Sequence, residues 1–237
     1  METLQLGELA VELVRKDIKH VHLSVHPPMG HVRIAAPQRM RLDTVRVFAA
    51  AKLGWIRLQQ RKVQAQPREP LSELVDRESH WLWGRRLLLV VVEQGAAASV
   101  SATHRQLLMR VRPGTSRLAR EALLDAWYRD QLRGALRPLL DRWSALMGVG
   151  VSRVFVQRMK TRWGSCSPAT RTLRLNTELA RKPIECLEFV LVHEMAHLLE
   201  PDHGRRFVDL MDALLPHWRQ LRDRLNCLPL PQAAWTL

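Results

Sequence analysis

The chain has 237 residues with 46% hydrophobic content, which is enough for one large domain or two small ones with a buried core. Its 37 Lys and Arg residues outnumber the 23 Asp and Glu residues, and the formal net charge at pH 7 is +14. The apolar run LLLVVV at 87–92 is too short to span a bilayer, so the composition argues against a membrane protein.

Cysteine usage and the N-terminal residues indicate where the protein works. Cys166, Cys186 and Cys227 form no CxxC pair, and their odd number leaves one thiol unpaired in any disulfide scheme, which is typical of a reducing compartment. The segment METLQLGELAVELVRKD carries acids where a secretory signal needs a basic start and an apolar core. We therefore expect a cytoplasmic protein without a membrane anchor.

The beginning of the chain predicts a hairpin followed by a helix. Residues 20–26 and 31–36 alternate polar and apolar side chains on either side of the turn sequence PPMG. Residues 43–63 then place apolar side chains three or four positions apart, and Asp43 is suited to be the N-cap. This spacing predicts one helix after the hairpin.

Two further strands are predicted beyond a polar connection. Residues 65–78 mix prolines and charges without a period, so we expect a surface connection there and a candidate lobe boundary. Residues 85–94 and 105–111 are typical of strands and are flanked by the turn sequences GAAAS and RPGT. We assign residues 1–115 to an N-terminal β-rich lobe with one helix.

The C-terminal part begins with a long predicted helix. Residues 116–147 carry apolar side chains at helical spacing, GVG ends the pattern, and Pro138 is expected to kink or break the helix. Residues 151–163 and 172–179, with SPATR between them, are predicted to form a strand pair. These elements begin the core that we assign to residues 116–237.

Two more helices are predicted after the strand pair. Pro183 and Pro201 are typical start and stop signals of a helix, and the residues between them are largely apolar. Beyond His203, apolar side chains at three- and four-residue steps predict one core helix, with His217 off the apolar stripe. The predicted fold class is therefore α+β, with an N-terminal β-rich lobe packed on a C-terminal core that contains a small sheet and these helices.

The first of these helices carries HEMAH at 193–197, which has the HExxH spacing. At about 100° per residue, His193 and His197 lie about 40° apart on one helix face, with Glu194 on the flank of that face. Two neutral imidazoles one turn apart can share a tetrahedral zinc ion, and the adjacent glutamate can reach the water on that ion. The spacing therefore predicts a catalytic Zn2+ site with Glu194 as general base.

A catalytic zinc site needs a third protein ligand and an open fourth position. His203 is favoured, because nitrogen ligands suit zinc and because Pro201 ends the helix and lets the chain turn back. Glu200 and Asp202 compete for this role, although Glu200 faces partly away from the pair and Asp202 is better suited to cap the next helix. The predicted metal ligands are His193, His197 and His203.

Three other interpretations of these residues stay open. The histidines can be polar residues on a half-buried helix that holds no metal. Cys166 can be a thiol nucleophile with a histidine as its base, although a small cysteine after a Gly-Ser turn is more often a packing residue. A hydrolase also needs a group that stabilises the oxyanion, and Tyr128 and nearby arginines are candidates that the sequence does not rank.

The positive charge raises the question of a nucleic-acid partner. Basic residues cluster just before the predicted metal helix, namely Arg158, Lys160, Arg162, Arg171, Arg174, Arg181 and Lys182. Arginines that grip phosphate would bind DNA weakly, without sequence preference and with strong salt dependence. The same residues could select acidic peptides, and codon bias alone can produce an excess of arginine. An alternative hypothesis is thus a basic nucleic-acid-associated protein whose metal site is structural or vestigial.

The chain resembles the YgjP-like metallopeptidase family, a relative of the SprT-like and WLM zinc peptidases, in the stretches KTRWGSC, LRLN and VHEMAHLLEPDHGRRF. The segments IKHVHLSV, VRIAAP and KLGWIRLQQRK extend this resemblance over most of the chain. The resemblance implies a minimal zincin-like catalytic core with a small sheet and an HExxH helix. It also implies a third histidine followed by Gly-x-x-Phe, which here are His203, Gly204 and Phe207.

The resemblance further implies a peptide or protein substrate that pairs in extended form with an edge strand near the metal. The WGSC and LRLN strands are then the expected wall of the substrate groove. SprT-like enzymes that digest DNA-crosslinked proteins often carry a cysteine zinc ribbon, and this sequence has no paired cysteine spacing of that kind. We therefore expect a zinc metallopeptidase, with DNA-linked proteolysis as the alternative.

Overall fold

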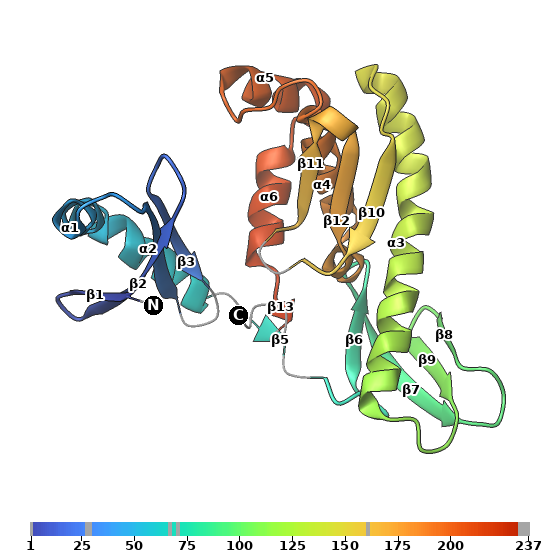
Figure 1. Cartoon of the computed structure of the whole chain (residues 1–237). Helices are drawn as coiled ribbons and strands as arrows, with labels where there is room; N and C mark the ends of the chain where they lie inside the picture. Colours follow the sequence, from blue (N-terminus) through green and yellow to red (C-terminus); the bar gives the residue numbers. More distant parts are fainter. Residues whose placement is uncertain (1, 27–29, 66–67, 70–71, 160–161, 232–237) are drawn as a thin grey trace. The chain divides into compact units, whose positions relative to one another are not determined.

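Figure 1 shows the chain as a computed structural model with an α+β fold. The structure describes residues 2–26, 30–65, 68–69, 72–159 and 162–231. The chain divides into two units, Met1–Pro70 with Pro229–Leu237 and Leu71–Leu228. The division falls within the predicted surface connection at 65–78, whereas the predicted boundary after residue 115 lies inside the second unit. The strands just before residue 115 belong to the second unit because their apolar side chains share a core with its helices.

A four-stranded mixed sheet with the order β1-β2-β4-β3 forms the centre of the first unit. Its strands are β1 (Glu2–Leu6), β2 (Leu9–Lys16), β3 (His22–His26) and β4 (His31–Pro37). The antiparallel β3–β4 pair confirms the predicted hairpin, and β2 runs parallel to β4. The pattern of the first residues does not predict β1 and β2.

Two helices, α1 (Leu42–Ala51) and α2 (Leu53–Ala65), stand where one helix over 43–63 is predicted. The break is at Lys52, whose backbone dihedrals of φ −103° and ψ 5° lie outside the helical region. Gly54, two residues further on, has the weakest helix propensity in this run and lowers the cost of the interruption.

The start of α1 also differs from the prediction. Arg41 is at the N-cap position, so Asp43 lies within the first turn, where its charge still interacts favourably with the helix dipole. The helices and the sheet bury a core of their own, consisting of Leu4, Val11, Leu13, Val32, Ile34, Ala36, Val45, Ala49 and Ile56. Two short parallel strands, β5 (Arg68–Glu69) and β13 (Leu230–Pro231), complete this unit.

The second unit begins with another four-stranded sheet, of order β6-β7-β9-β8. Its strands are β6 (Ser79–Leu82), β7 (Arg85–Glu93), β8 (Ser99–Ala102) and β9 (Gln106–Val111). The predicted strands β7 and β9 are confirmed and lie parallel to each other. The short strands β6 and β8 have too few residues for a recognisable pattern.

The turn between β6 and β7 is docked on the segment that leads into the helix after Pro183. Trp83 and Gly84 both have positive φ, at 50° and 75°, as in the primed turns of hairpins. The Trp83 amide donates a hydrogen bond to the Ala180 carbonyl at 2.8 Å. A Cβ on Gly84 would lie 2.9 Å from Cγ of Pro183, so only glycine fits at this contact. The hairpin therefore supports the start of the next helix in the core.

The long helix α3 (Arg117–Met147) runs without interruption through Pro138, where a kink or break is predicted. Its N-cap, Ser116, accepts a hydrogen bond from the Ala119 amide, and Gly148 ends it in the left-handed conformation. The helix continues because its packing against neighbouring elements outweighs the hydrogen bond that proline removes. Among the described residues, no helix has the length and apolarity needed to cross a membrane.

A three-stranded sheet of order β10-β12-β11 carries the residues next to the histidines. Its strands are β10 (Arg153–Gln157), β11 (Gly164–Ser167) and β12 (Thr172–Asn176), with the short 3-10 helices η1 (Pro168–Thr170) and η2 (Thr177–Arg181). Strand β12 is parallel to β10 and antiparallel to β11. Within the predicted strand over 151–163 only β10 is a strand, and β11 begins just after this segment, on the other side of β12.

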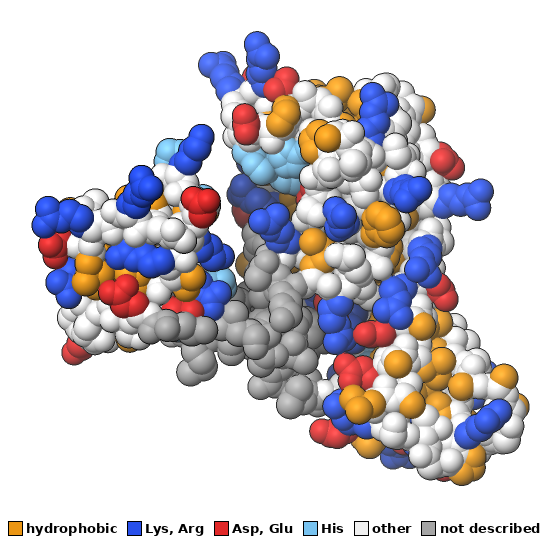
Figure 2. Space-filling view, in the orientation of Figure 1, with side chains coloured by type: hydrophobic (Ala, Val, Ile, Leu, Met, Phe, Trp, Pro, Cys, Tyr) orange, Lys and Arg blue, Asp and Glu red, His pale blue; other side chains and the backbone are white. Residues whose placement is uncertain are grey.

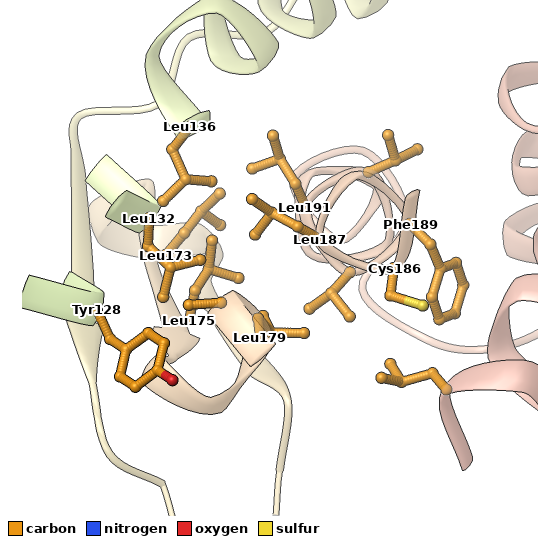
Figure 3. Packing of buried hydrophobic residues seen from close by; sticks show 14 of the residues in the cluster. Tyr128, Leu132, Leu136, Leu173, Leu175, Leu179, Cys186, Leu187, Phe189 and Leu191 are labelled. Atoms are coloured by element: carbon orange, nitrogen blue, oxygen red, sulfur yellow. The ribbon is translucent and has the colours of Figure 1, made fainter. Parts of the chain in front are cut away.

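Helix α4 (Ile184–Ala196) packs between this sheet and the other helices of the unit. Figure 3 shows Leu187 and Leu191 of α4 directed toward Leu173 of β12 and Leu136 of α3. Leu187, Leu191 and Leu173 are fully buried. Because α4 is buried along most of its length, its position relative to the sheet is determined by this core.

The C-terminal segment of this unit contains two helices, α5 (Arg205–Leu214) and α6 (Trp218–Cys227), where one is predicted. Pro216 lies between them and disfavours a continuous helix, because it removes a helical hydrogen bond and its ring crowds the preceding turn. Phe207 and Met211 of α5 and Trp218 and Leu225 of α6 are buried in the core of the unit. Both helices contact α4.

Candidate metal centre

Helix α4 positions the first two histidines. It begins after Pro183, as predicted, but ends at Ala196 rather than at residue 200. His197 is the C-cap and retains right-handed helical dihedrals of φ −66° and ψ −13°. The one-turn relationship with His193 therefore holds, and the two imidazole centroids are 5.1 Å apart.

His203 joins this pair after a tight reversal of the chain. The Leu198 and Leu199 amides donate to the Met195 and Ala196 carbonyls, both at 3.0 Å, and these tighter three-residue bonds form the turn in which α4 ends. His203 Nε2 then lies 3.1 Å from His193 Nε2, and one ring nitrogen from each histidine lies within 4.8 Å of the others. Histidine side chains form a surface patch next to α5 in Figure 2, with basic side chains beside it. The site is thus accessible from solvent.

Phe207 is the common neighbour of the three imidazoles. The centroid of its ring lies 5.0 Å from that of His193, 4.7 Å from that of His197 and 4.8 Å from that of His203. Phe207 is only 2% exposed, so it holds the histidines against the apolar core. The apolar stripe of the sequence places Phe207 in the core, whereas its contact with every member of the cluster depends on the turn before α5.

The outer contact of His197 fits a metal-binding role. A carbonyl oxygen only accepts, so His197 Nδ1–H donates to the Glu200 carbonyl at 3.2 Å and leaves Nε2 with its lone pair. The carboxylates of Glu200 and Asp202 do not belong to the cluster formed by the described residues. Asp202 is also not the predicted helix cap, because Gly204 is the N-cap of α5 and no side chain caps it.

The donor set itself supports a metal ion. Two imidazole nitrogens on one tetrahedral zinc ion lie about 3.3 Å apart when each bond is about 2.0–2.1 Å, and His193 and His203 have a comparable separation of 3.1 Å. Burial lowers the pKa of His193 to about 4, with a further lowering from the neighbouring histidines, and burial also lowers the pKa of His197. Both imidazoles are therefore neutral at pH 7, which is the form that binds metal.

Glu194 follows His193 in α4, and its side chain is withdrawn from solvent. It is 7% exposed, and burial raises the pKa of its carboxyl group to about 7, partly offset by the charge of Arg162. A carboxyl group with a pKa near neutrality can both accept and release a proton at physiological pH. This environment suits a general base better than a metal ligand or a salt-bridge partner.

Asn176 organises the loop before β11, and sequence reasoning does not single it out. Its side-chain amide donates to the Met159 and Arg162 carbonyls at 2.9 and 2.8 Å, and its backbone amide donates to the Trp163 carbonyl at 2.9 Å. Asn176 is 3% exposed. A polar residue at the end of the apolar LRLN strand is the one signal in the sequence, because a buried amide needs partners.

Two other candidate residues are less suited to catalysis in this structure. Tyr128 is 1% exposed, and its hydroxyl donates to the Trp81 carbonyl at 2.8 Å, so it does not face the histidines. Burial, together with the charge of Glu194, raises the pKa of the Cys166 thiol to about 11. A thiol of this kind is protonated at neutral pH and is a poor nucleophile.

The predicted basic cluster is partly internal. Arg158 forms ion pairs with Glu121 and Asp125 at 3.4 and 3.2 Å. Arg181 pairs with Glu178 at 3.2 Å, and Lys182 is only 2% exposed. The side chains of Arg162 and Arg171 are exposed, Arg174 is partly exposed, and Lys160 lies outside the described residues. The basic surface available to an anionic partner is therefore smaller than the sequence suggests.

One family model matches most of the chain. A family model described as "YgjP-like, metallopeptidase domain" matches residues 19–227. Among solved structures, the metallopeptidase zymogen of Pyrococcus abyssi abylysin is similar at 22% identity and a TM-score of 0.35, over 37% of this chain and 89% of that chain. The zymogen of Methanocaldococcus jannaschii jannalysin is similar at 20% identity and a TM-score of 0.34, over 38% and 91%. The search of curated proteins finds no significant match.

Proposed function

The chain belongs to the YgjP-like metallopeptidase family, and we propose that it hydrolyses peptide bonds with a zinc ion held by three histidines and with Glu194 as the general base. The proposed ligands are His193, His197 and His203. One observation carries the proposal, namely the convergence of three imidazole nitrogens within 4.8 Å of one another beside a buried carboxylate. The family supports metallopeptidase activity, while the choice of metal, ligands and base is our inference from this geometry.

Zinc is the metal that best matches the donor set. Three neutral nitrogen ligands with an open fourth position are typical of catalytic zinc, whereas a structural site usually fills the fourth position with Cys or His. When bound, zinc supplies Lewis acidity, which acidifies a water molecule and polarises the peptide carbonyl. The residues of the chain supply the positioning and the proton transfer.

Glu194 is proposed to move the proton. Its carboxylate takes a proton from the attacking water as the new C–O bond forms, and it returns this proton to the amine as the C–N bond breaks. The pKa of about 7, raised by burial, suits both steps. Burial also keeps the carboxylate in one orientation, because α4 and the sheet surround it.

The proposed substrate is an extended peptide or protein segment. Strand β11 is at the end of the strand order in its sheet and contacts α4, so a substrate strand added to it would run beside the metal helix. Arg162 is exposed and its charge acts on Glu194, which makes it the proposed cation for the developing oxyanion in place of Tyr128. Replacement of Arg162 should therefore lower the turnover rate more than it lowers the affinity for zinc.

A metal-depletion experiment tests this function. Casein hydrolysis should stop when a chelator removes the metal, return when zinc is added, and be unaffected by a thiol-alkylating reagent. Metal analysis of the purified protein should find one zinc per chain. Hydrolysis that persists without metal but is abolished by alkylation would contradict the proposal and favour Cys166 as a nucleophile.

A further inference from the structure

The backbone of Gly164 lies directly against the side chain of Glu194. A Cβ built on Gly164 would be 2.7 Å from Oε1, 2.8 Å from Cγ and 3.0 Å from Cδ of Glu194. These are the three nearest heavy atoms, and each distance is at or below 3.0 Å, a separation at which one of the two groups must move. The contact joins the first residue of β11 to the proposed general base on α4.

Backbone conformation does not explain why glycine occupies this position. Gly164 is in strand β11 and does not have positive φ, so an alanine could adopt the same dihedrals. Glycines with positive φ, such as Gly84 and Gly148, are different, because a side chain would strain their backbone. The requirement at Gly164 is therefore for space, and the space is occupied by the Glu194 carboxyl group.

The strand is held in place from several sides. Gly164 is opposite Leu175 in the β11–β12 register, and Leu175 is fully buried. The residue before it, Trp163, accepts a hydrogen bond from the Asn176 amide at 2.9 Å. The Asn176 side chain donates to the Arg162 carbonyl at 2.8 Å. A side chain at position 164 would therefore push against Glu194 rather than shift the strand.

On the Glu194 side of this contact, only the side chain can move. Helix α4 is buried against the sheet, and its residues Val192 and Met195, on either side of the HE pair, are fully buried. The backbone of Glu194 is thus fixed, so an added Cβ at position 164 is accommodated by a change in the Glu194 side-chain rotamer. An added Cβ would accordingly turn the carboxylate away from its place beside the histidines.

We propose that Gly164 is a positioning residue that sets the location of the Glu194 carboxylate by leaving room for it. The inference rests on the proposed role of Glu194 as general base. It assigns to the first residue of the β11 strand a part in catalysis that is separate from the pairing of substrate with that strand. Gly164 acts through Glu194 and does not itself contact the reacting atoms.

The kinetic test compares Gly164→Ala with Gly150→Ala. Gly150 lies in the same unit, does not have positive φ, and a Cβ there would have only Arg171 Nη1 nearby, at 4.0 Å. We expect Gly164→Ala to lower kcat on casein by about 100-fold, as displacement of a catalytic group by about 1 Å can do, with KM and zinc content unchanged. Gly150→Ala should behave as the unchanged protein. A kcat for Gly164→Ala within about 3-fold of that of Gly150→Ala would overturn the proposal.

A stability measurement tests the same contact without relying on turnover. The thermal unfolding midpoint is measured for Gly164→Ala, Glu194→Ala and the double variant. Any loss of stability caused by Gly164→Ala should disappear in the Glu194→Ala background, because the atoms that meet the new Cβ are then absent. A loss that persists in that background would overturn the proposal, even if Gly164→Ala alone were too unstable for kinetics.

The two measurements separate this inference from the proposed function. If Glu194→Gln retains full hydrolysis, Glu194 is not the base and the role of Gly164 in catalysis fails with it. The stability cycle still reports whether Gly164 and Glu194 are coupled in that case. If Glu194→Gln is inactive while Gly164→Ala retains full kcat, the proposed function stands and only the positioning role is wrong.

Discussion

Nε2 of His193 lies 3.1 Å from Nε2 of His203, although one residue is within helix α4 and the other follows the turn that ends it. Two ring nitrogens at this separation match two ligands of one tetrahedral metal ion. An ordinary amphipathic helix with exposed histidines would not bring a third imidazole to the same point. The relationship makes the identity of the third ligand directly testable.

We predict that His203→Ala reduces zinc content, while Glu200→Ala and Asp202→Ala retain one zinc per chain. The carboxylates of the two acids are outside the histidine cluster, so their removal leaves its three ring nitrogens unchanged. Loss of His203 should cost more than the roughly 10- to 100-fold in affinity that loss of an outer contact costs. Metal analysis after dialysis measures this. Full zinc in His203→Ala with loss in either acid variant would show that the third ligand is a carboxylate.

The sequence predicts the first part of this site well. The helical period alone places His193 and His197 on one face, because both lie within one turn of a continuous helix. The choice among His203, Glu200 and Asp202 depends on how the chain turns after Ala196, and helical periodicity carries no information about a turn. Chemical preference for nitrogen ligands is the only guide to that choice from sequence.

The rest of the fold is predicted unevenly for physical reasons. Pro216 could have indicated the break between α5 and α6, because a proline within a helical pattern is a readable signal. Short strands such as β6 and β8 have too few residues for a pattern. The contact between Gly164 and Glu194 joins positions far apart in the chain and exists only after the sheet and helix have packed.

The buried carboxyl group of Glu194 predicts a cost in stability. The pKa of Glu194 is about 7 in the folded protein, above the ordinary value of 4.5. The contribution of its carboxyl group to the free energy of unfolding is therefore full below pH 4.5 and is lost as pH rises through 7. In the metal-free protein, this loss is about 3 kcal/mol between pH 4.5 and pH 8. Glu194→Gln should not show it. Urea unfolding of both apo proteins at these pH values measures the difference, and parallel pH profiles would contradict the prediction.

His80 predicts a stability change of the opposite sign. It is 2% exposed, and neither ring nitrogen has a hydrogen-bond partner among the described residues. Burial, with help from the charge of Arg181, lowers its pKa to about 4. The contribution of His80 to the free energy of unfolding is therefore full above pH 6.5 and is lost as pH falls through 4.

The test of this prediction compares the protein with His80→Phe, which has a similar volume and does not titrate. When the pH falls from 7.5 to 4.5, the free energy of unfolding of the unchanged protein should decrease by about 2 kcal/mol more than that of the variant. Other titrating groups are common to both proteins and cancel. Equal losses in the two proteins would show that His80 is solvated or finds a partner.

The arginine surface predicts weak binding to nucleic acid. Because Arg158 and Arg181 are engaged in ion pairs and Lys182 is buried, few members of the basic cluster can contact phosphate. We expect DNA binding without sequence preference, with a shallow dependence on salt because each phosphate contact adds about −0.9 to the slope. A filter-binding titration across salt concentrations measures this slope. A steep slope, or proteolysis stimulated by DNA, would instead support a DNA-linked protease.

The rate of peptide hydrolysis by Glu194→Gln, measured on protein with confirmed zinc content, tests the proposed mechanism most directly. Glutamine has nearly the same shape as glutamate and cannot accept the proton of the attacking water. We predict one zinc per chain, an unchanged fold, and casein hydrolysis lowered by about 100-fold or more. Hydrolysis at the unchanged rate by the zinc-loaded variant would contradict the role of Glu194 as general base.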